Sequence, residues 1–376
     1  MNIAVLRETV SGETRVALTP VIVSQVVSSG LEVIIEKGAG MQSSFTDARY
    51  VEAGAKIVSE ATKLYEMADV VLKVQKPDDD EIAMMKPGST LITFLWALSD
   101  QPLVEKLQKA GITAIGMDAL PRISRAQKMD ALSAMSSIAG YKAVLLGANA
   151  LGKYLPMLVT AAGTIAPAKV LVMGAGVAGL QAIATAKRLG AVVEAFDVRP
   201  AVKEQVESLG ATYIDIPLEE EKTETHGGYA KELSKEAQEK QRKLMHEHVK
   251  KSDLVITTAL VPGKPAPQLI SAKMVADMQP GTVIVDLAAE QGGNCELTRP
   301  GEDFFTDNGV IIRGPLNLPA AMPIHASQLY AKTIHALLMH MIKDGELHFD
   351  FEDEITKNAV ITHDGKVVSS LLIPTE

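Results

Sequence analysis

Cysteine and tryptophan are scarce in this chain, which has one of each among 376 residues. The single Cys295 excludes a disulfide within the chain, as suits a reducing compartment. The eight histidines show no spacing typical of metal ligands, so we predict no metal site. Basic residues are outnumbered too, and the formal net charge of −9 argues against nucleic acid as the main partner.

Long apolar runs are also missing. No uninterrupted apolar stretch reaches the roughly 18 residues needed to cross a membrane. The N-terminal residues 1–10 lack the basic and apolar regions of a signal peptide. We therefore expect a soluble, cytoplasmic chain that is attached to a membrane only through a partner.

What the chain does have is a glycine-rich turn between two apolar strands, in segment 169–197. An apolar strand, a G-x-G-x-x-G turn, a run of helix formers and a second strand follow one another at 170–173, 174–179, 180–189 and 192–196. In a dinucleotide site, Gly174 makes the tight turn, Gly176 admits the pyrophosphate and Gly179 lets helix and strand pack closely. The first N–H groups of the helix would bind the phosphates.

Asp197 ends the second strand, 18 residues after Gly179. Its carboxylate would accept hydrogen bonds from the adenosine ribose hydroxyls, and its charge would repel a 2′-phosphate. The segment therefore predicts NAD(H) rather than NADP(H). Arg199 follows two residues later and is interpreted as a solvated loop residue.

Strands alternate with helical segments along the chain, which predicts an α/β fold with parallel sheets. We predict two Rossmann-like doubly wound parallel-sheet domains joined by long helices at 131–151 and 324–342, the second domain inserted in the first. The expected domains are a discontinuous N-terminal α/β domain and an inserted NAD(H)-binding domain with its connecting helix, at 1–130 plus 324–376 and at 131–323.

Two of these segments carry local signals. The helix at 131–151 is rich in Ala, Gly and Ser, which permits close packing against neighbours. Near the end of the chain, 358–369 predicts a hairpin that turns at Asp364-Gly365.

Residues 217–232 break the alternation, because they are charged, contain glycine and show no period. Loops of this length are typically lids or functional loops, although a disordered insertion is the alternative. Gly228 beside Tyr229 favours a lid, since a flexible hinge next to an aromatic can fold over a bound ligand.

Five motifs together resemble the alanine dehydrogenase and transhydrogenase α-subunit superfamily over nearly the whole chain. They are RVALTP at 15–20, KPGSTLITFL at 86–95, VLVMGAGVAGLQA at 170–182, DLVITTALVPGKPAP at 253–267 and VDLAAEQGGNCE at 285–296. Two functions share this family: an amino-acid dehydrogenase, and the NAD(H)-binding component of a proton-translocating transhydrogenase.

The resemblance to the dehydrogenases fails where their chemistry occurs. In that branch an arginine and a lysine hold a keto acid, and a histidine and an aspartate do acid–base work. Arg15 matches the arginine, but the other three positions carry Gln75, Trp96 and Glu290. A glutamine cannot neutralise a carboxylate, and a tryptophan N–H cannot cycle a proton near neutral pH.

Segment 121–130, PRISRAQKMD, resembles the transhydrogenase branch closely. The resemblance implies that this loop lines the nicotinamide site, with catalytic roles for Arg122, Gln127 and Asp130, and Ser133 one turn further on. Gln127 offers a donor and an acceptor to a carboxamide, and an Arg122–Asp130 pair would pin the loop. Asp130 is also a good N-cap for the following helix, and the two roles are compatible.

The resemblance further implies nucleotide contacts in several segments. In 121–130 and the glycine turn they are Arg122, Ile123, Ser124, Arg125, Gln127, Gly174, Gly176, Val177, Ala178 and Gly179. Elsewhere they are Asp197, Val198, Arg199, Gly228, Tyr229, Gln241 and Leu260, with Asn317 in a further segment near the site.

We expect an NAD(P)+ transhydrogenase component that binds NAD(H) and passes hydride to NADP+ held on a partner domain. Such a transfer needs two nicotinamide rings positioned roughly 3–3.5 Å apart, with no acid or base. The resemblance implies a homodimer, a separate NADP(H)-binding domain, and membrane proton-channel subunits that attach the chain to the inner or plasma membrane. Because the chain ends at Glu376 without membrane segments, we expect the membrane portion to be encoded elsewhere. An alanine dehydrogenase-like enzyme and an NAD-binding module without activity of its own are the alternatives.

Overall fold

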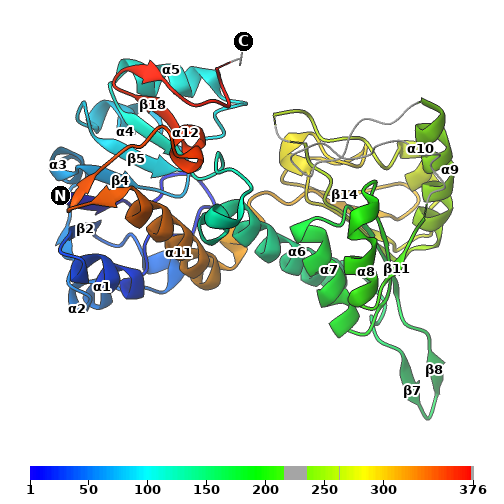
Figure 1. Cartoon of the computed structure of the whole chain (residues 1–376). Helices are drawn as coiled ribbons and strands as arrows, with labels where there is room; N and C mark the ends of the chain where they lie inside the picture. The colour runs from blue at the N-terminus through cyan, green and yellow to red at the C-terminus, as the bar shows by residue number, and fades with distance from the viewer. Residues whose placement is uncertain (216–234, 262, 374–376) are drawn as a thin grey trace. The chain divides into compact units, whose positions relative to one another are not determined.

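The computed structural model describes residues 1–215, 235–261 and 263–373 (Figure 1). The chain divides into two compact units: unit 1 comprises Met1–Met135 with Pro319–Glu376, and unit 2 comprises Ser136–Leu318. The first boundary falls within helix α6 (Ala131–Ala150).

Unit 1 is built on an eight-stranded sheet in the order β19-β18-β6-β5-β4-β1-β2-β3. Its strands are β1 (Asn2–Val5), β2 (Glu32–Glu36), β3 (Lys56–Val58), β4 (Val70–Leu72), β5 (Thr90–Thr93), β6 (Thr113–Gly116), β18 (Val360–His363) and β19 (Lys366–Val367). The first six are parallel, and β18 runs antiparallel to both β6 and β19. Its helices are α1 (Pro20–Ser28), α2 (Asp47–Glu52), α3 (Ala61–Met67), α4 (Asp79–Met84), α5 (Gln101–Lys109), α11 (Pro323–Met341) and α12 (Glu354–Ala359), with 3-10 turns η1 (Met41–Ser43) and η2 (Ser124–Met129). A short ribbon of β16 (Ile342–Lys343) and β17 (Glu346–Leu347) follows α11.

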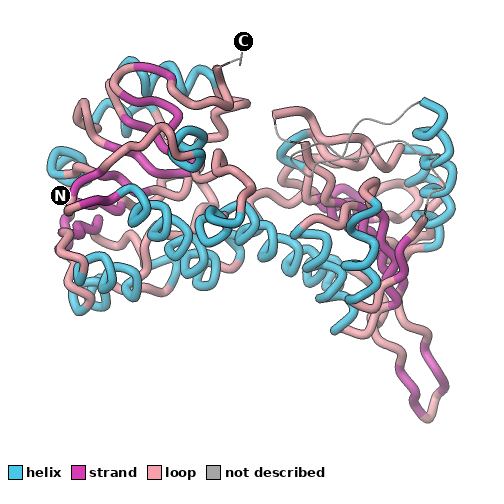
Figure 2. Tube along the Cα trace, viewed as in Figure 1, coloured by secondary structure: helices cyan, strands magenta, loops and turns pink. Residues whose placement is uncertain are grey.

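Unit 2 has a seven-stranded sheet in the order β11-β10-β9-β12-β13-β15-β14. Its strands are β9 (Lys169–Met173), β10 (Val192–Phe196), β11 (Thr212–Tyr213), β12 (Leu254–Thr257), β13 (Val283–Asp286), β14 (Asp303–Phe305) and β15 (Ile311–Arg313). All pair in parallel except the edge strand β14. The helices are α7 (Val177–Arg188), α8 (Lys203–Ser208), α9 (Lys235–Lys251) and α10 (Ala272–Ala276), with 3-10 turns η3 (Pro200–Val202), η4 (Ala289–Gln291) and, at the unit boundary, η5 (Leu318–Ala321). A separate hairpin pairs β7 (Leu158–Thr160) with β8 (Gly163–Ile165) (Figure 2).

The strand orders confirm the predicted fold class of two Rossmann-like doubly wound sheets. In each unit the chain builds outward from a central strand and then reverses, so that β1 lies beside β4 and β9 lies beside β12. Such a reversal opens a crevice at the carboxyl ends of the two central strands. The central strands are apolar runs because both of their faces are covered, and residues 170–173 of β9 are at most 1% exposed.

Local predictions succeeded better than edge predictions. The hairpin predicted at 358–369 is present, and Asp364 and Gly365 both have positive φ, as a tight turn between antiparallel strands requires. The predicted strand at 212–216 is described only as β11, and the prediction did not include the hairpin β7–β8 or the antiparallel strand β14. Edge elements bury little and so leave a weak hydrophobic pattern.

Among the described helices, α6 alone is long and apolar enough by length and composition to cross a membrane. This test is weak evidence, because a core helix of a soluble protein passes it as well. The small residues of α6 have a packing role: a Cβ on Gly140 would lie 2.0 Å from the carbonyl oxygen of Ala178, and one on Gly147 would lie 2.5 Å from Cδ1 of Leu254. The predicted close packing is therefore present, on α7 and β12.

Candidate functional site

The glycine turn after β9 leaves no room for larger residues. Gly174 has φ +102°, and a Cβ there would lie 2.5 Å from Oγ1 of Thr258. A Cβ on Gly179 would lie 1.8 Å from the carbonyl oxygen of Gly174. Both glycines are thus required by the backbone, as the motif predicts, and together they bring the start of α7 against the end of β9.

The N-terminus of α7 is open above this turn. Gly176 is its N-cap residue and has no side chain to satisfy the first N–H groups of the helix. A Cβ on Gly176 would meet nothing closer than the Arg199 guanidinium at 4.0 Å. Val177 and Leu260, which end the segments after β9 and β12, are apolar yet 44% and 41% exposed. This combination of open N–H groups and apolar walls fits a nucleotide pyrophosphate and its flanking rings.

Asp197 is saturated with hydrogen bonds. Its Oδ2 accepts from the backbone N–H of Ala175 at 2.7 Å and from the Arg199 guanidinium at 2.9 Å, while Oδ1 accepts from the Arg199 backbone N–H at 2.9 Å. The interpretation of Arg199 as a solvated loop residue is therefore wrong, because its charge is paired with the buried carboxylate. The fold thus fixes the expected ribose acceptor and a cation side by side next to Gly176.

A buried polar network lies at the carboxyl ends of β12 and β13. Asn294 donates from its amide to the carbonyls of Ala259 and Pro267, both at 2.8 Å, and accepts from the Ala259 N–H at 3.0 Å. Asp286 accepts from the hydroxyls of Thr257 and Thr298. These contacts hold the loop that carries Leu260. Sequence reasoning missed Asn294 and Asp286, although two polar residues that end and follow an apolar strand were the available signal.

Glu290 and Asn317 lie together in unit 2. Asn317 has φ 46° and donates its backbone N–H to Oε1 of Glu290 at 2.7 Å. Glu290 is the residue that stands where the dehydrogenase branch would have its aspartate. Here it binds a left-handed turn, which is a structural contact.

Segment 121–130 belongs to unit 1 and has a two-sided burial pattern. Ala126 and Met129 are buried, whereas Arg122, Ser124, Arg125, Gln127 and Lys128 are exposed and Ile123 is half-buried. Asp130 accepts from the N–H of Ser133 at 2.8 Å and from its hydroxyl at 2.5 Å, so it is the N-cap of α6, as the alternative interpretation predicted. The segment presents polar side chains from a fixed backbone.

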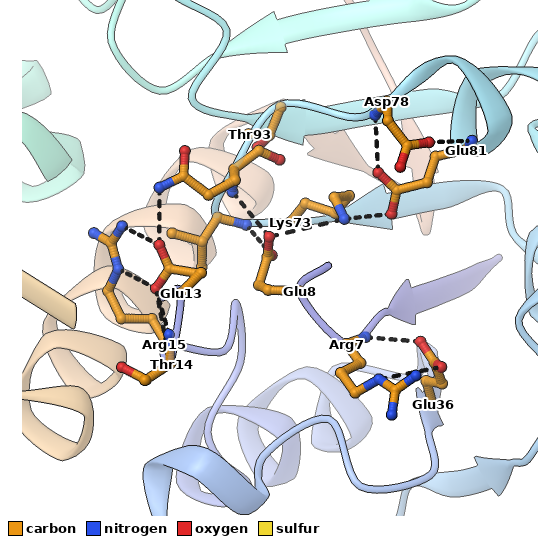
Figure 3. Close-up of polar contacts among 12 residues, drawn as sticks. Arg7, Glu8, Glu13, Thr14, Arg15, Glu36, Lys73, Asp78, Glu81 and Thr93 are labelled. Atoms are coloured by element: carbon orange, nitrogen blue, oxygen red, sulfur yellow. Dashed lines mark hydrogen bonds and ion pairs between the residues drawn. The ribbon is translucent and has the colours of Figure 1, made fainter. Parts of the chain in front are cut away.

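Figure 3 shows a cluster of charges in unit 1, where β1 and β4 end. Arg15 and Glu13 form a buried ion pair at 2.5 Å, and Gln75 donates its amide to Glu13 at 2.8 Å. Burial raises the pKa of Glu13, but the bonds from Arg15 outweigh it and lower the pKa to about 2. Arg15 is thus neutralised from within, in the place where a dehydrogenase would use the arginine for a substrate carboxylate.

Lys73 forms the second half of this cluster. Its ammonium lies 2.6 Å from Glu81 and 3.8 Å from Glu8, and its side chain is fully buried (Figure 3). Glu8 also accepts from the backbone N–H groups of Val74 and Gln75. Burial raises the pKa of Glu8 to about 7, against the attraction of Lys73. Glu8 therefore holds a proton in much of the population at neutral pH.

Trp96 stands where the dehydrogenase branch would have its histidine. Its φ of 53° lies in the left-handed region, which is costly for a bulky side chain. Asp118 holds this turn by accepting from the N–H groups of Leu95 and Trp96 at 2.7 and 3.0 Å. The indole stacks on Phe94 with the ring centroids 5.7 Å apart. The position presents an aromatic face with no group that titrates near neutral pH.

The predicted contacts divide between the two units. Arg122 to Ser133 lie in unit 1, and Gly174 to Arg199 with Leu260 lie in unit 2. Val198 packs against the buried core of unit 2. Gly228 and Tyr229, with the predicted lid, lie outside the described residues, as does the side chain of Gln241 in α9.

The sequence matches two family models, alanine dehydrogenase/PNT N-terminal domain at residues 4–139 and C-terminal domain at residues 143–370. A polypeptide of NAD(P) transhydrogenase subunit alpha from Rhodospirillum rubrum is 50% identical over 380 residues, covering 99% of each chain. The crystal structure of transhydrogenase from Sinorhizobium meliloti superposes with a TM-score of 0.87 at 40% identity, over 99% of this chain and all of that one. Alanine dehydrogenase of Halomonas elongata is 32% identical, over 98% of this chain and 94% of its own.

Proposed function

The chain belongs to the alanine dehydrogenase/PNT family, and from that membership we propose that it is the NAD(H)-binding component of a proton-translocating transhydrogenase. Its higher identity to transhydrogenase subunits than to alanine dehydrogenases supports this branch.

The observation that carries the proposal is the internal neutralisation of Arg15. A keto acid needs an unmatched cation, but the Arg15 guanidinium is paired with Glu13, and Gln75 is turned to the same carboxylate. Trp96 offers no imidazole for proton transfer. A chain that binds a nucleotide but lacks these groups suits hydride transfer between two nicotinamides.

We propose that the backbone of the glycine turn binds the NAD(H) pyrophosphate. The N–H groups of Val177, Ala178 and Gly179 would donate to it, with Arg199 as the neighbouring cation. Asp197 would accept from the adenosine ribose, so that NAD(H) is bound in preference to NADP(H). Further proposed contacts are Val198, Gly228, Tyr229, Gln241 and Leu260.

In the reaction, the C4 hydride of the NADH nicotinamide passes to C4 of the nicotinamide of NADP+ on a partner domain. NADH is thereby oxidised to NAD+ and NADP+ is reduced to NADPH, and no proton is released at the reacting carbons. Arg122, Gln127 and Asp130 would position the donor ring, with Ile123, Ser124 and Ser133 beside them. Their contribution is orientation, because a hydride transfers only between closely aligned rings.

The partners follow from the same proposal. We propose a homodimer of this chain, a separate NADP(H)-binding domain, and membrane subunits that couple hydride transfer to proton movement. The chain would lie on the cytoplasmic side and be held at the inner or plasma membrane through those subunits.

The test combines the purified chain with the NADP(H)-binding domain of a transhydrogenase. NADH and thio-NADP+ are added, and reduction of the thio analogue is followed by its absorbance. We expect turnover that needs both proteins and is lost in Gly179→Ala, with Gly152→Ala as the control because a Cβ there meets nothing within 4 Å. Absence of exchange above background would refute the proposal. Turnover of alanine with NAD+ by the chain alone would instead identify a dehydrogenase, and NADH binding without any turnover would identify a binding module.

A further inference from the structure

Arg125 lies at the centre of an ion-pair chain that ties segment 121–130 to two other elements of unit 1. Its guanidinium donates to Oδ1 of Asp353 at 2.7 Å. The other oxygen of that carboxylate, Oδ2, lies 2.7 Å from Nε2 of His340. His340 belongs to the last turn of α11, and Asp353 directly precedes α12. One carboxylate therefore joins η2, α11 and the start of α12.

Asp353 makes these contacts instead of a local one. It occupies the N-cap position of α12, where an aspartate ordinarily accepts a hydrogen bond from the first turn of its own helix. No such bond forms, and both oxygens are directed to Arg125 and His340. An aspartate that served only as a cap would face its own helix, so the geometry points to the loop contact as the role of this side chain.

The pair is better shielded than an ordinary surface ion pair. The Asp353 side chain is only 14% exposed, although that of Arg125 is 63% exposed. Burial raises the pKa of Asp353, but the bonds from Arg125 and His340 outweigh it, and the pKa is lowered. The carboxylate is therefore charged at neutral pH and holds both partners.

The backbone of η2 needs such an external anchor on its exposed side. Ala126 and Met129 are buried at 2% and 1% exposure and fix the inner side of the turn. Arg122 and Gln127 lie on the outer side, where Arg125 is also found. A tether at Arg125 limits the movement of the residues that flank it on both sides in the sequence.

We propose that Asp353 is a positioning residue that acts through Arg125 to hold segment 121–130 in the conformation that binds the nicotinamide half of NAD(H). This inference rests on the proposed function for the identity of the ligand. It also changes the predicted role of Arg125, from a cofactor contact to the tether of the loop that carries Arg122 and Gln127.

The test measures NADH and ADP-ribose binding to the full chain by calorimetry, since ADP-ribose lacks the nicotinamide. The variants are Arg125→Ala, Asp353→Ala, the double variant, and the conservative Asp353→Glu. Lys106→Ala is the matched control, because it removes the exposed ion pair with Asp79 in the same unit, away from this loop. If the competent fraction of the loop falls to between a third and a tenth, the NADH Kd rises about three- to tenfold in each single variant.

Three further results are expected. The double variant equals the singles, because both act on one tether. ADP-ribose affinity stays at the wild-type value in all variants, and Asp353→Glu restores most of the NADH affinity. A purely structural role would instead lower the affinity for both ligands together with the Tm.

Two outcomes would overturn the inference. One is an Asp353→Ala or Asp353→Glu chain that is folded and keeps the wild-type ratio of NADH to ADP-ribose affinity. The other is a further loss when Arg125→Ala is added to Asp353→Ala, which would make Arg125 a direct ligand. Failure of the proposed function is a separate result, because it appears as missing hydride exchange in the wild-type chain whatever the binding ratios of the variants.

Discussion

Gly140→Ala tests whether the packing of α6 on α7 shapes the nucleotide site. Within a helix this substitution would ordinarily stabilise by about 1 kcal/mol, since alanine is the better helix former. Here the new Cβ would lie 2.0 Å from the carbonyl oxygen of Ala178 and 2.8 Å from its carbonyl carbon. Both contacts are with backbone, so no side-chain rotation can relieve them, and the two helices must move apart by more than about 1 Å to reach ordinary contact at 3.4 Å.

The magnitude follows from the two opposed effects. Overpacking of a close-packed interface costs roughly 1–3 kcal/mol, and contact with rigid backbone places this site at the upper end. After the helix propensity is subtracted, we expect a net loss of about 1–2 kcal/mol in the free energy of unfolding. The displaced Ala178 is also one of the proposed phosphate donors. Loss of one charge-assisted hydrogen bond of about 1.5 kcal/mol would raise the NADH Kd roughly tenfold.

The assay is urea unfolding followed by circular dichroism, with NADH binding measured on the same preparations. Gly152→Ala is the control, because no atom lies within 4 Å of its Cβ. The reasoning would be refuted by a Gly140→Ala chain that is as stable as Gly152→Ala and binds NADH as tightly as the wild type.

Three further predictions concern single carboxylates. Burial raises the pKa of Glu8 to about 7, so its contribution to stability is present below about pH 4.5 and is lost as the pH rises through 7; Glu8→Gln should therefore gain stability relative to wild type between pH 5 and pH 8 in urea titrations, and parallel curves would contradict this. The pKa of Glu13, which burial raises and Arg15 lowers further, is about 2, so its contribution is present above about pH 4.5 and is lost as the pH falls towards 2; Glu13→Gln should show a flatter acid limb by the same measurement. Asp197→Ala should weaken NADH binding by roughly tenfold, for loss of one or two hydrogen bonds to the ribose, and should narrow the preference over NADPH in fluorescence titrations; an unchanged preference would exclude Asp197 as its source.

Residues whose conformation is set locally were predictable from the sequence. Gly174 and Gly179 identify the turn after β9 because only glycine fits a positive φ or a Cβ-to-carbonyl distance of 1.8 Å. Asp364-Gly365 identifies a hairpin for the same reason, and Asp130 identifies the start of α6. These signals act over a few residues, and the alternation of strands and helices extends them to the α/β fold class.

Pairings between distant residues were decided only by the tertiary structure. Arg125 and Asp353 are separated by 228 positions, and no spacing in the sequence brings them together. Glu8 gains its raised pKa from burial beside β4, which follows from the order of strands in the sheet. Even for Arg199, two residues from Asp197, the sequence alone leads to the wrong interpretation, because pairing depends on burial that the sequence does not state. The sequence determined the conformations, the fold class and the nucleotide turn, since these depend on local sterics and periodicity; the tertiary structure decided which charges meet, since strand order sets their separation and burial sets their strength.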